Sequence, residues 1–333
     1  MAKVHASLMT EIAKILKENK DVCVTENVDM AAFTSFRAGG RAALMAEAKN
    51  PAGLCAILRA VDSCRAPHIV LGNGSNTLFK DSGYDGVVVR LAPEGFAAVT
   101  VTGAGEGGKS DARGAGEAGS AEVGGDSVYV RAGAAVLLSS LARTLLNESL
   151  SGFEFASGIP GSFGGALFMN AGAYGGEMKD IVESVQAVCA DGSAEKIFSA
   201  PEMDFSYRRS ALQENGYIAV SAVLRLERGR REEIASRMKE LAEKRNSKQP
   251  VSFPSAGSTF KRPPGHFAGQ LIEKAGLKGV AVGGAQVSTL HSGFIINRGG
   301  ATATDILQLI TLVQNRVYDE TGVMLEPEVR IIG

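Results

Sequence analysis

The sequence predicts an α+β protein, because helical and strand-like patterns are mixed along the chain without a regular βαβ rhythm. The 333 residues are enough for two or three domains, each with its own core. Apolar residues make up 45% and charged residues 21%, which excludes a globally disordered or collagen-like chain. Glycine is the outlier with 41 residues, and its clusters indicate loops where the backbone approaches a ligand closely.

Apolar residues recur at helical spacing in several stretches. The first covers 8–18, with lysines and a glutamate on the opposite face. Asn50-Pro51 is typical of an N-cap followed by proline at the first helical position. The helix that follows has an apolar stripe of Leu54, Ile57, Leu58 and Val61. Further helices are expected near 136–147, 231–246, 268–275 and 304–320.

Short runs of β-branched residues predict strands between these helices. One run, 69–71, leads directly into the glycine-containing loop 72–77, and 87–89 is a second buried strand. Other strands are expected at 97–102, 127–131, 181–190 and 217–226. Residues 103–125 are almost all Gly, Ala, Ser, Glu and Asp, so we expect a flexible surface insertion there. A domain boundary is expected near 228–231.

Composition also excludes several classes of function. Lysine and arginine (35) balance aspartate and glutamate (36), so neither nucleic acid nor an anionic membrane is expected as the main partner. No run of 18 apolar residues predicts a membrane span, and the N-terminal pattern is a helix rather than a signal peptide. The four cysteines and four histidines have no metal-ligand spacing, which favours reduced thiols, a cytoplasmic protein and no metal site.

Two glycine-rich loops are the first candidates for chemistry. The loop 72–77 follows a strand, and its consecutive peptide N–H groups could form a nest for phosphate oxygens. It is a poor Rossmann fingerprint, because Thr77 replaces the third glycine, and alone it would be read as a glycine turn. The second loop, 158–165, continues to 169–176 and suits a backbone pressed against a flat ligand, although a packed turn is the alternative. Two such loops favour a dinucleotide.

Three further segments carry polar candidates. Tyr207-Arg208 at the end of a strand could hold a carboxylate, although a solvated surface arginine is commoner. Ser258 is exposed among small residues, but no Gly-x-Ser-x-Gly elbow surrounds it, so a hydrolase nucleophile is not expected. The segment 325–330 is expected to be a last strand with one inward carboxylate.

These segments, in this order, closely resemble the UDP-N-acetylenolpyruvoylglucosamine reductase family, flavoenzymes that complete UDP-N-acetylmuramate for peptidoglycan. The resemblance runs from Thr34 to the C-terminus and rests on five motifs together. They are Asn73-Gly74-Ser75-Asn76, Gly158-Ile159-Pro160-Gly161, Tyr207-Arg208, Ala256-Gly257-Ser258 and Glu326-Pro327-Glu328.

The resemblance implies FAD held by two subdomains of the vanillyl-alcohol-oxidase type, residues 1–92 and 93–229. A C-terminal α+β substrate domain, 230–333, would follow, and its last strand could return to the FAD site. The loop 72–77 would cradle the FAD pyrophosphate, and 158–165 with 170–175 would line the flavin. The cofactor-binding residues so implied are Gly72, Asn73, Gly74, Ser75, Asn76, Thr77, Ile159, Pro160, Ser162, Gly165 and Gly172.

The resemblance also implies roles in catalysis and substrate binding. Arg208, Ser258 and Glu328 would be the catalytic set. Tyr207, Lys248 and His291 would contact substrate, with Lys248 close to substrate or NADPH. Reduction of an enolpyruvyl ether adds a hydride to C3 and a proton to C2. Negative charge then develops on C2 and the carboxylate, where Arg208 and a protonated Glu328 would stabilise it and Ser258 would deliver the proton.

The sequence departs from the family pattern in three places. The insertion 103–125 is longer than expected, and the segment Ser288–His291 differs from the expected form. Between Arg208 and the strand at 217 there is no room for the long tyrosine-bearing loop of one subgroup, so the chain resembles the second, shorter type. We expect a cytoplasmic monomer that binds a UDP-sugar and NADPH.

Two other functions remain open from the sequence. One is an FAD oxidase of the same fold that acts on an alcohol with oxygen, which would not need Ser258 and Glu328. The other is a UDP-sugar-binding protein that has lost its flavin. A yellow protein that NADPH bleaches and substrate restores would distinguish the reductase from both.

Overall fold

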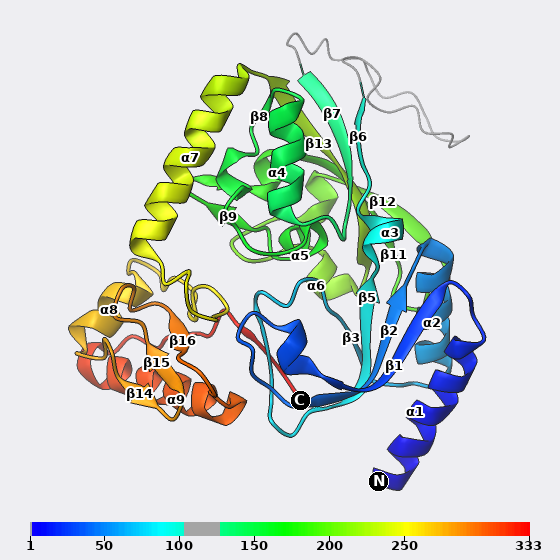
Figure 1. Ribbon diagram of the computed structural model, residues 1–333, viewed down its shortest axis with the longest axis horizontal. Helices are drawn as coiled ribbons and strands as arrows, with labels where there is room; N and C mark the ends of the chain where they lie inside the picture. The colour runs from blue at the N-terminus through cyan, green and yellow to red at the C-terminus, as the bar shows by residue number, and fades with distance from the viewer. Residues whose placement is uncertain (1, 103–126) are drawn as a thin grey trace. The chain divides into compact units, whose positions relative to one another are not determined.

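The computed structural model describes residues 2–102 and 127–333 (Figure 1). The expected insertion 103–125 lies outside these residues. The chain forms two compact units, one of residues 1–91 with 243–333 and the other of residues 92–242. These units do not distinguish the three domains expected from the sequence, so that division stays a prediction.

The N-terminal part of unit 1 is a four-stranded sheet covered by two helices. Its order is β1-β2-β5-β3, with β1 antiparallel to β2, and with β2 and β3 both parallel to β5. The central strand β5 contains Val87–Val89, which are fully buried, as expected for a strand paired on both sides. The bounds are α1 (Ala2–Lys17), β1 (Val22–Asp29), β2 (Arg41–Ala48), α2 (Pro51–Ser63), β3 (His68–Val70) and β5 (Tyr84–Leu91).

Local signals explain why α2 begins where it does. The Asn50 side chain accepts a hydrogen bond from Gly53 N at 2.9 Å, and Pro51 occupies the first helical position. The predicted stripe from Leu54 to Val61 is buried against the sheet. α9 (Ala303–Thr321) is delimited in the same way, by a capping box of Thr302 and Asp305 and by Gly322 in the left-handed conformation.

The C-terminal part of unit 1 is a small α+β layer. A three-stranded sheet, β14-β15-β16, packs against α9, and α8 also contacts that helix (Figure 1). The bounds are α8 (Ala268–Lys274), β14 (Ala281–Val282), β15 (Ala285–Val287) and β16 (Ile295–Asn297). The last strand, β17 (Arg330–Ile332), pairs in parallel with β4 (Thr77–Phe79), directly after the loop 72–77.

Two polar side chains fasten this C-terminal part to the N-terminal part of the same unit. Asp81 accepts hydrogen bonds from Ala303 N at 2.9 Å and Thr304 N at 2.7 Å, at the start of α9. Partial burial opposes ionisation of Asp81, but these bonds and one from the Thr304 hydroxyl hold its pKa below the ordinary value. Asn297 donates from Nδ2 to the Phe36 carbonyl at 2.9 Å.

Unit 2 is built on a six-stranded antiparallel sheet with helices on one face. The order is β12-β11-β13-β7-β6, and β8 pairs with the end of β13. Figure 1 shows α4 in front of this sheet, and its buried leucines join the main core of the unit. The bounds are β6 (Val99–Thr102), β7 (Ser127–Gly133), β8 (Leu150–Ser151), β11 (Val182–Val188), β12 (Glu195–Ser199) and β13 (Ile218–Arg228).

Short elements connect these strands. They are α3 (Pro93–Phe96), α4 (Leu138–Asn147), α5 (Phe163–Phe168), β9 (Gly172–Ala173), β10 (Gly176–Glu177) and α6 (Leu212–Asn215). α7 (Arg231–Lys248) begins in unit 2 and ends in unit 1. The six helices predicted from apolar spacing are therefore present, as are the first six predicted strands.

Two local predictions are wrong. The segment 325–330 is not a strand, because only an isolated bridge at Pro327 precedes β17, which begins at Arg330. Tyr207-Arg208 does not end a strand either. It is the tip of a tight turn closed by a bridge between Ser206 and Arg209.

Candidate active site

Ser258 and Glu328 lie on two neighbouring segments of unit 1. Glu328 N donates to the Thr259 carbonyl at 2.8 Å, and Lys261 N donates to the Glu326 carbonyl at 2.8 Å. These bonds run on either side of a bridge between Phe260 and Pro327. Residues that are about seventy positions apart in the sequence are thereby held next to each other.

A buried frame supports the Ser258 hydroxyl. Thr259 is fully buried, its N–H donates to the Gly293 carbonyl at 2.8 Å, and its hydroxyl accepts from Ile295 N at 3.0 Å. Ser258 itself is half-buried, and among the described residues its Oγ makes a single, long hydrogen bond of 3.4 Å to the Phe260 carbonyl. The hydroxyl is therefore fixed by its backbone and remains available to a ligand.

The loop 72–77 belongs to the same hydrogen-bonded structure as Glu328. Asn76 Nδ2 donates to the Glu328 carbonyl at 3.1 Å, and Arg330 N donates to the Asn76 carbonyl at 3.0 Å. Thr77 then pairs with Arg330 at the start of β4 and β17. The first and the last of the sequence motifs are thus adjacent within unit 1.

Gly74 determines the shape of this loop. Its φ is +63°, and a Cβ at this position would lie 2.0 Å from the Phe33 carbonyl oxygen. Its own carbonyl accepts from Ser35 N at 3.1 Å. In the described part of the chain, the peptide N–H groups of residues 72–76 donate no hydrogen bond to the protein. Donors arranged in this way fit the phosphates of a dinucleotide such as FAD.

His291 lies beside Gly293, whose carbonyl accepts the hydrogen bond from Thr259 N. Its Nδ1 accepts from Gly293 N at 3.1 Å, and its ring packs edge-on against Phe294 with centroids 5.0 Å apart. Burial lowers the pKa of this imidazole, so the neutral form with the proton on Nε2 is favoured. A Cβ on Gly293 would be 3.0 Å from His291 Cε1 and 3.5 Å from Ser258 Oγ, which brings the two predicted residues to one glycine.

In unit 2, the loop 158–165 leads into α5. Gly161 has φ +144°, and its carbonyl accepts from Leu138 N at 3.1 Å. Ser162 is buried at the N-cap position, and Gly164 N donates to the Ala134 carbonyl at 2.7 Å. The remaining predicted positions differ in exposure: Ile159 and Gly172 are half-buried, whereas Pro160 and Gly165 are exposed. Because the glycines and the serine of this loop are small, its peptide backbone is accessible to a ligand.

The Tyr207-Arg208 turn lies in unit 2. Ser206 and Arg209 exchange two backbone hydrogen bonds of 3.1 Å, with Arg208 in the left-handed region at φ +57°. The Arg208 guanidinium lies 5.0 Å from the centre of the Tyr207 ring, which is 49% exposed. The next residue, Arg209, instead bonds Asp204 and Glu214 at 2.8 and 2.7 Å. Arg209 is thus a structural residue.

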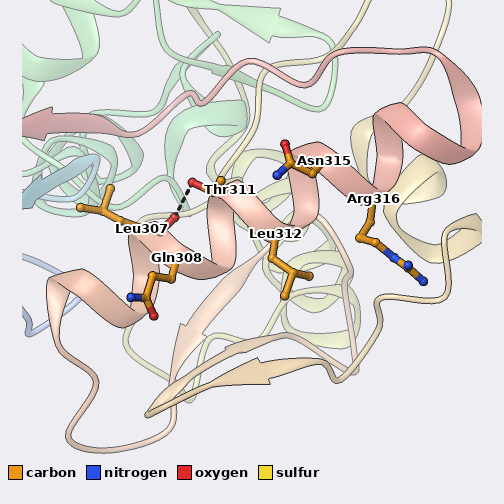
Figure 2. A pocket seen from close by; sticks show the side chains of 6 residues that line it. All are labelled: Leu307, Gln308, Thr311, Leu312, Asn315 and Arg316. Atoms are coloured by element: carbon orange, nitrogen blue, oxygen red, sulfur yellow. Dashed lines mark hydrogen bonds between the residues drawn. The ribbon is translucent and has the colours of Figure 1, made fainter.

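A separate groove lies on α9. It has a volume of about 560 Å³ and is lined by Leu307, Gln308, Thr311, Leu312, Asn315 and Arg316 (Figure 2). None of the predicted site residues lines it. Lys248, the remaining predicted residue, is exposed at the last position of α7. Within 2–102 and 127–333, no group of three or more His, Cys, Asp or Glu residues could hold a metal ion.

Comparison with known proteins decides the family. Residues 249–332 match the family described as UDP-N-acetylenolpyruvoylglucosamine reductase, C-terminal domain, and residues 118–197 match an FAD binding domain. Over 330 residues the chain is 46% identical to UDP-N-acetylenolpyruvoylglucosamine reductase of Clostridioides difficile, which covers 99% of this chain and 98% of that protein. The chain belongs to the UDP-N-acetylenolpyruvoylglucosamine reductase family.

Other members of the family agree in length and fold. The reductase of Latilactobacillus sakei is 41% identical over 326 residues, 98% of this chain and 99% of that protein. The crystal structure of UDP-N-acetylenolpyruvylglucosamine reductase from Thermus caldophilus superposes with a TM-score of 0.74 at 35% identity, covering 94% of this chain and all of that one. The fold predicted from the resemblance, an FAD-binding fold with a C-terminal substrate domain, is confirmed.

The activity follows from family membership. The chain is an FAD-dependent oxidoreductase of peptidoglycan synthesis that uses NADPH to reduce the enolpyruvyl group of UDP-N-acetylglucosamine enolpyruvate, giving UDP-N-acetylmuramate. The predicted family, activity and cofactors are therefore confirmed. No helix in the described part of the chain is long and apolar enough to cross a membrane.

From the sequence, Asn170 is expected only within the run 170–175 that lines the flavin, and neither its link to the Arg208 turn nor Glu177 is singled out. Asn170 is almost completely buried, and Glu177 forms an ion pair with Lys179 at 2.9 Å. The hydrogen bond from Lys179 is the main cause that holds the pKa of Glu177 below its ordinary value, and Arg208 contributes. The positive φ of Asn170, +42°, leaves a weak sequence signal, namely an asparagine within a glycine-rich run.

Proposed function

We propose that Arg208, Ser258 and Glu328 are the catalytic residues of this reductase. The observation that supports the proposal is the pairing of the segments that carry Ser258 and Glu328. Glu328 N donates to the Thr259 carbonyl, and the Glu328 carbonyl accepts from Asn76 in the loop 72–77. A half-buried hydroxyl and a half-buried carboxyl group are thereby held together by backbone bonds. Arg208, in unit 2, adds a guanidinium that its neighbour Arg209 cannot supply, because Arg209 is bonded to two carboxylates.

Each residue has a separate task. When bound, FAD supplies hydride chemistry between NADPH and C3 of the enolpyruvyl group. Arg208 holds the substrate carboxylate with two parallel N–H bonds and stabilises the charge that develops there. Glu328, in its protonated form, donates a hydrogen bond to the same charge. Ser258 gives the proton of its hydroxyl to C2, which is basic enough in the enolate to accept it.

Other residues bind the cofactor and the substrate. We propose that residues 72–77 bind the FAD pyrophosphate through their peptide N–H groups, and that Ile159, Pro160, Ser162, Gly165 and Gly172 line the flavin. Tyr207, Lys248 and His291 contact the UDP-sugar, with Lys248 close to the substrate or to NADPH. The supporting observations are the unused peptide donors of the first loop and the position of His291 beside the glycine that Ser258 approaches.

Three further properties complete the proposal. FAD is held by two subdomains, 1–92 and 93–229, and substrate by 230–333. The protein acts as a monomer in the cytoplasm. None of the four cysteines forms a disulfide in the described part of the chain, which agrees with a reducing compartment. Sedimentation velocity tests the monomer, and fractionation of the cell tests the compartment.

A matched pair of variants tests the catalytic assignment. Glu328→Gln removes the proposed donor, whereas Glu326→Gln, two residues away, removes an exposed carboxylate that pairs only with Lys261 among the bonds described. The assay is anaerobic stopped-flow absorbance of the flavin. Bleaching by NADPH is expected to stay close to the parent in both variants. Restoration of the colour by the enolpyruvyl substrate is expected to slow by roughly 100-fold in Glu328→Gln alone.

Two results would contradict the assignment. Equal rates of colour restoration in Glu328→Gln and Glu326→Gln would remove Glu328 from the chemistry. Bleaching of the flavin by an alcohol and restoration of its colour by oxygen, with no restoration by the enolpyruvyl substrate, would favour an oxidase.

A further inference from the structure

Asn170 is a buried polar side chain that bonds the turn carrying the proposed arginine. It is 1% exposed, and its amide makes hydrogen bonds in three directions. Nδ2 donates to Glu177 Oε2 at 3.0 Å and to the Ser206 carbonyl at 3.0 Å. Oδ1 accepts from Lys179 N at 3.0 Å. Because two acceptors face one end and an N–H faces the other, the orientation of the amide is determined by its partners.

Ser206, whose carbonyl accepts the bond from Asn170, is the first residue of the turn that carries Arg208. The turn is fastened to the segment 168–170 at several points. Besides the Asn170 bond, Ser210 Oγ donates to the Phe168 carbonyl at 2.8 Å. Gln213 Nε2 donates to the Phe168 carbonyl at 2.7 Å and to the Arg208 carbonyl at 2.9 Å. The arginine turn therefore takes its position from the end of α5 and the residues that follow it.

Arg208 needs this support. Its φ of +57° lies in the left-handed region, which residues with a Cβ avoid unless the surrounding structure holds them there. A turn closed by two backbone bonds of 3.1 Å keeps its shape, but those bonds do not fix its place in the unit. Asn170 and Gln213 supply that placement, Asn170 at the entry of the turn and Gln213 at its tip.

The same segment leads into the residues proposed to line the flavin. Asn170 lies two residues after the end of α5 and precedes Gly172, and both belong to the glycine-rich run 169–176. A contact from Asn170 to the Ser206 carbonyl thus ties the position of the carboxylate-binding arginine to the wall of the cofactor site. A shift of about 1 Å between such groups can lower a rate by roughly 100-fold.

We propose that Asn170 is a positioning residue for the reduction step, which acts by holding the Ser206–Arg209 turn so that Arg208 meets the substrate carboxylate. The proposal rests on the proposed role of Arg208. Asn170 does not itself touch the reacting atoms. Its Nδ2 donor is the group that matters, since this donor reaches the turn.

Asn170→Asp tests the donor with little change in shape. Aspartate tolerates the left-handed conformation and keeps the acceptor for Lys179 N, but it has no N–H for the Ser206 carbonyl or for Glu177 Oε2, and it faces the Glu177 carboxylate with a like charge. Asn170→Gly, which suits φ +42°, is the second variant and removes the side chain without backbone strain. The control is Asn215→Asp, which keeps the acceptor for Tyr217 N and lies outside the site.

We expect FAD content and bleaching by NADPH to stay within about 2-fold of the parent in all three variants. In Asn170→Asp and Asn170→Gly, colour restoration by the enolpyruvyl substrate should slow roughly 10- to 100-fold, with a higher KM for that substrate. The control should restore colour at the parent rate. Loss of FAD, or equal slowing of both half-reactions, would assign Asn170 a purely structural role and overturn the proposal.

A double-mutant cycle with Arg208→Gln separates the two levels of the argument. If Asn170 acts through Arg208, Asn170→Asp should slow colour restoration by less than about 2-fold in the Arg208→Gln background. A full additional loss in that background would overturn the positioning role. Arg208→Gln with a parent rate of restoration would instead refute the proposed role of Arg208. A slow Arg208→Gln beside a parent-like Asn170→Asp would refute only the inference about Asn170.

Discussion

Gly74→Ala is a sharp test of the loop that we assign to the FAD pyrophosphate. The new Cβ would lie 2.0 Å from the Phe33 carbonyl oxygen and has to move to at least 3.0 Å. Gly74 also has φ +63°, where alanine is disfavoured by about 1 kcal/mol. The movement breaks the hydrogen bond from Ser35 N to the Gly74 carbonyl, which contributes about 1 kcal/mol.

These two contributions amount to about 2 kcal/mol. The variant loop has to regain the parent conformation to bind FAD, so this free energy is subtracted from the free energy of FAD binding. The expected result is an FAD dissociation constant raised by about 30-fold. Gly276→Ala is the matched control. Its φ is +70°, no atom lies within 4 Å of the new Cβ, and it lies outside the loop. It carries the same conformational cost and should bind FAD as the parent does.

The measurement is titration of each apoprotein with FAD, followed by the quenching of flavin fluorescence. Thermal unfolding of the apoproteins, measured in parallel, reports the shared conformational cost. Equal FAD affinity in Gly74→Ala and Gly276→Ala would show that the backbone of residues 72–77 is not the cradle.

Two further predictions concern stability. Burial raises the pKa of the Tyr84 phenol from 10.0 to about 12. The unfolded chain therefore releases this proton first, and the free energy of unfolding falls as pH rises from 10 through 12. Tyr84→Phe should remove that fall, which urea unfolding at pH 9 and pH 11.5 checks; the same fall in parent and variant would contradict the prediction. Ser292 Oγ is buried with no hydrogen-bond partner in the described part of the chain. Ser292→Ala should therefore raise the free energy of unfolding by about 1 kcal/mol. A free energy of unfolding below that of the parent, measured by calorimetry, would mean that the hydroxyl is hydrogen-bonded.

Local signals made most helices predictable. α2 and α9 have both an apolar stripe and residues that cap them, so their ends follow from a few neighbouring residues. β2 was missed for the opposite reason. Its sequence, Arg41–Ala48, is rich in alanine, leucine, methionine and glutamate, which favour helices in isolation. Pairing with β1 and β5 overrides that preference, and no local pattern reports such pairing.

The candidate site was predictable as a set of motifs but not as a geometry. Ser258 and Glu328 were selected by resemblance, and the backbone bonds that join their segments cross a long stretch of chain. The turn at Tyr207-Arg208 was wrongly predicted to be the end of a strand. Side-chain hydrogen bonds from Asn170 and Gln213 hold this turn, and a local sequence pattern does not report such bonds. Asn170 was expected only as part of the flavin-lining run 170–175, and its contact with Ser206 could be found only in three dimensions.

Ser258→Ala, observed in both half-reactions, shows whether the Ser258 hydroxyl supplies the proton to the substrate. The hydroxyl makes one long hydrogen bond of 3.4 Å, so its removal leaves the fold and FAD binding unchanged. No proton passes to a substrate carbon while NADPH bleaches the flavin, so that rate should stay close to the parent. Restoration of the colour by the enolpyruvyl substrate should slow by at least ~100-fold, the lower end for loss of a positioned general acid. A parent-like rate of restoration would contradict the account and leave water as the proton donor.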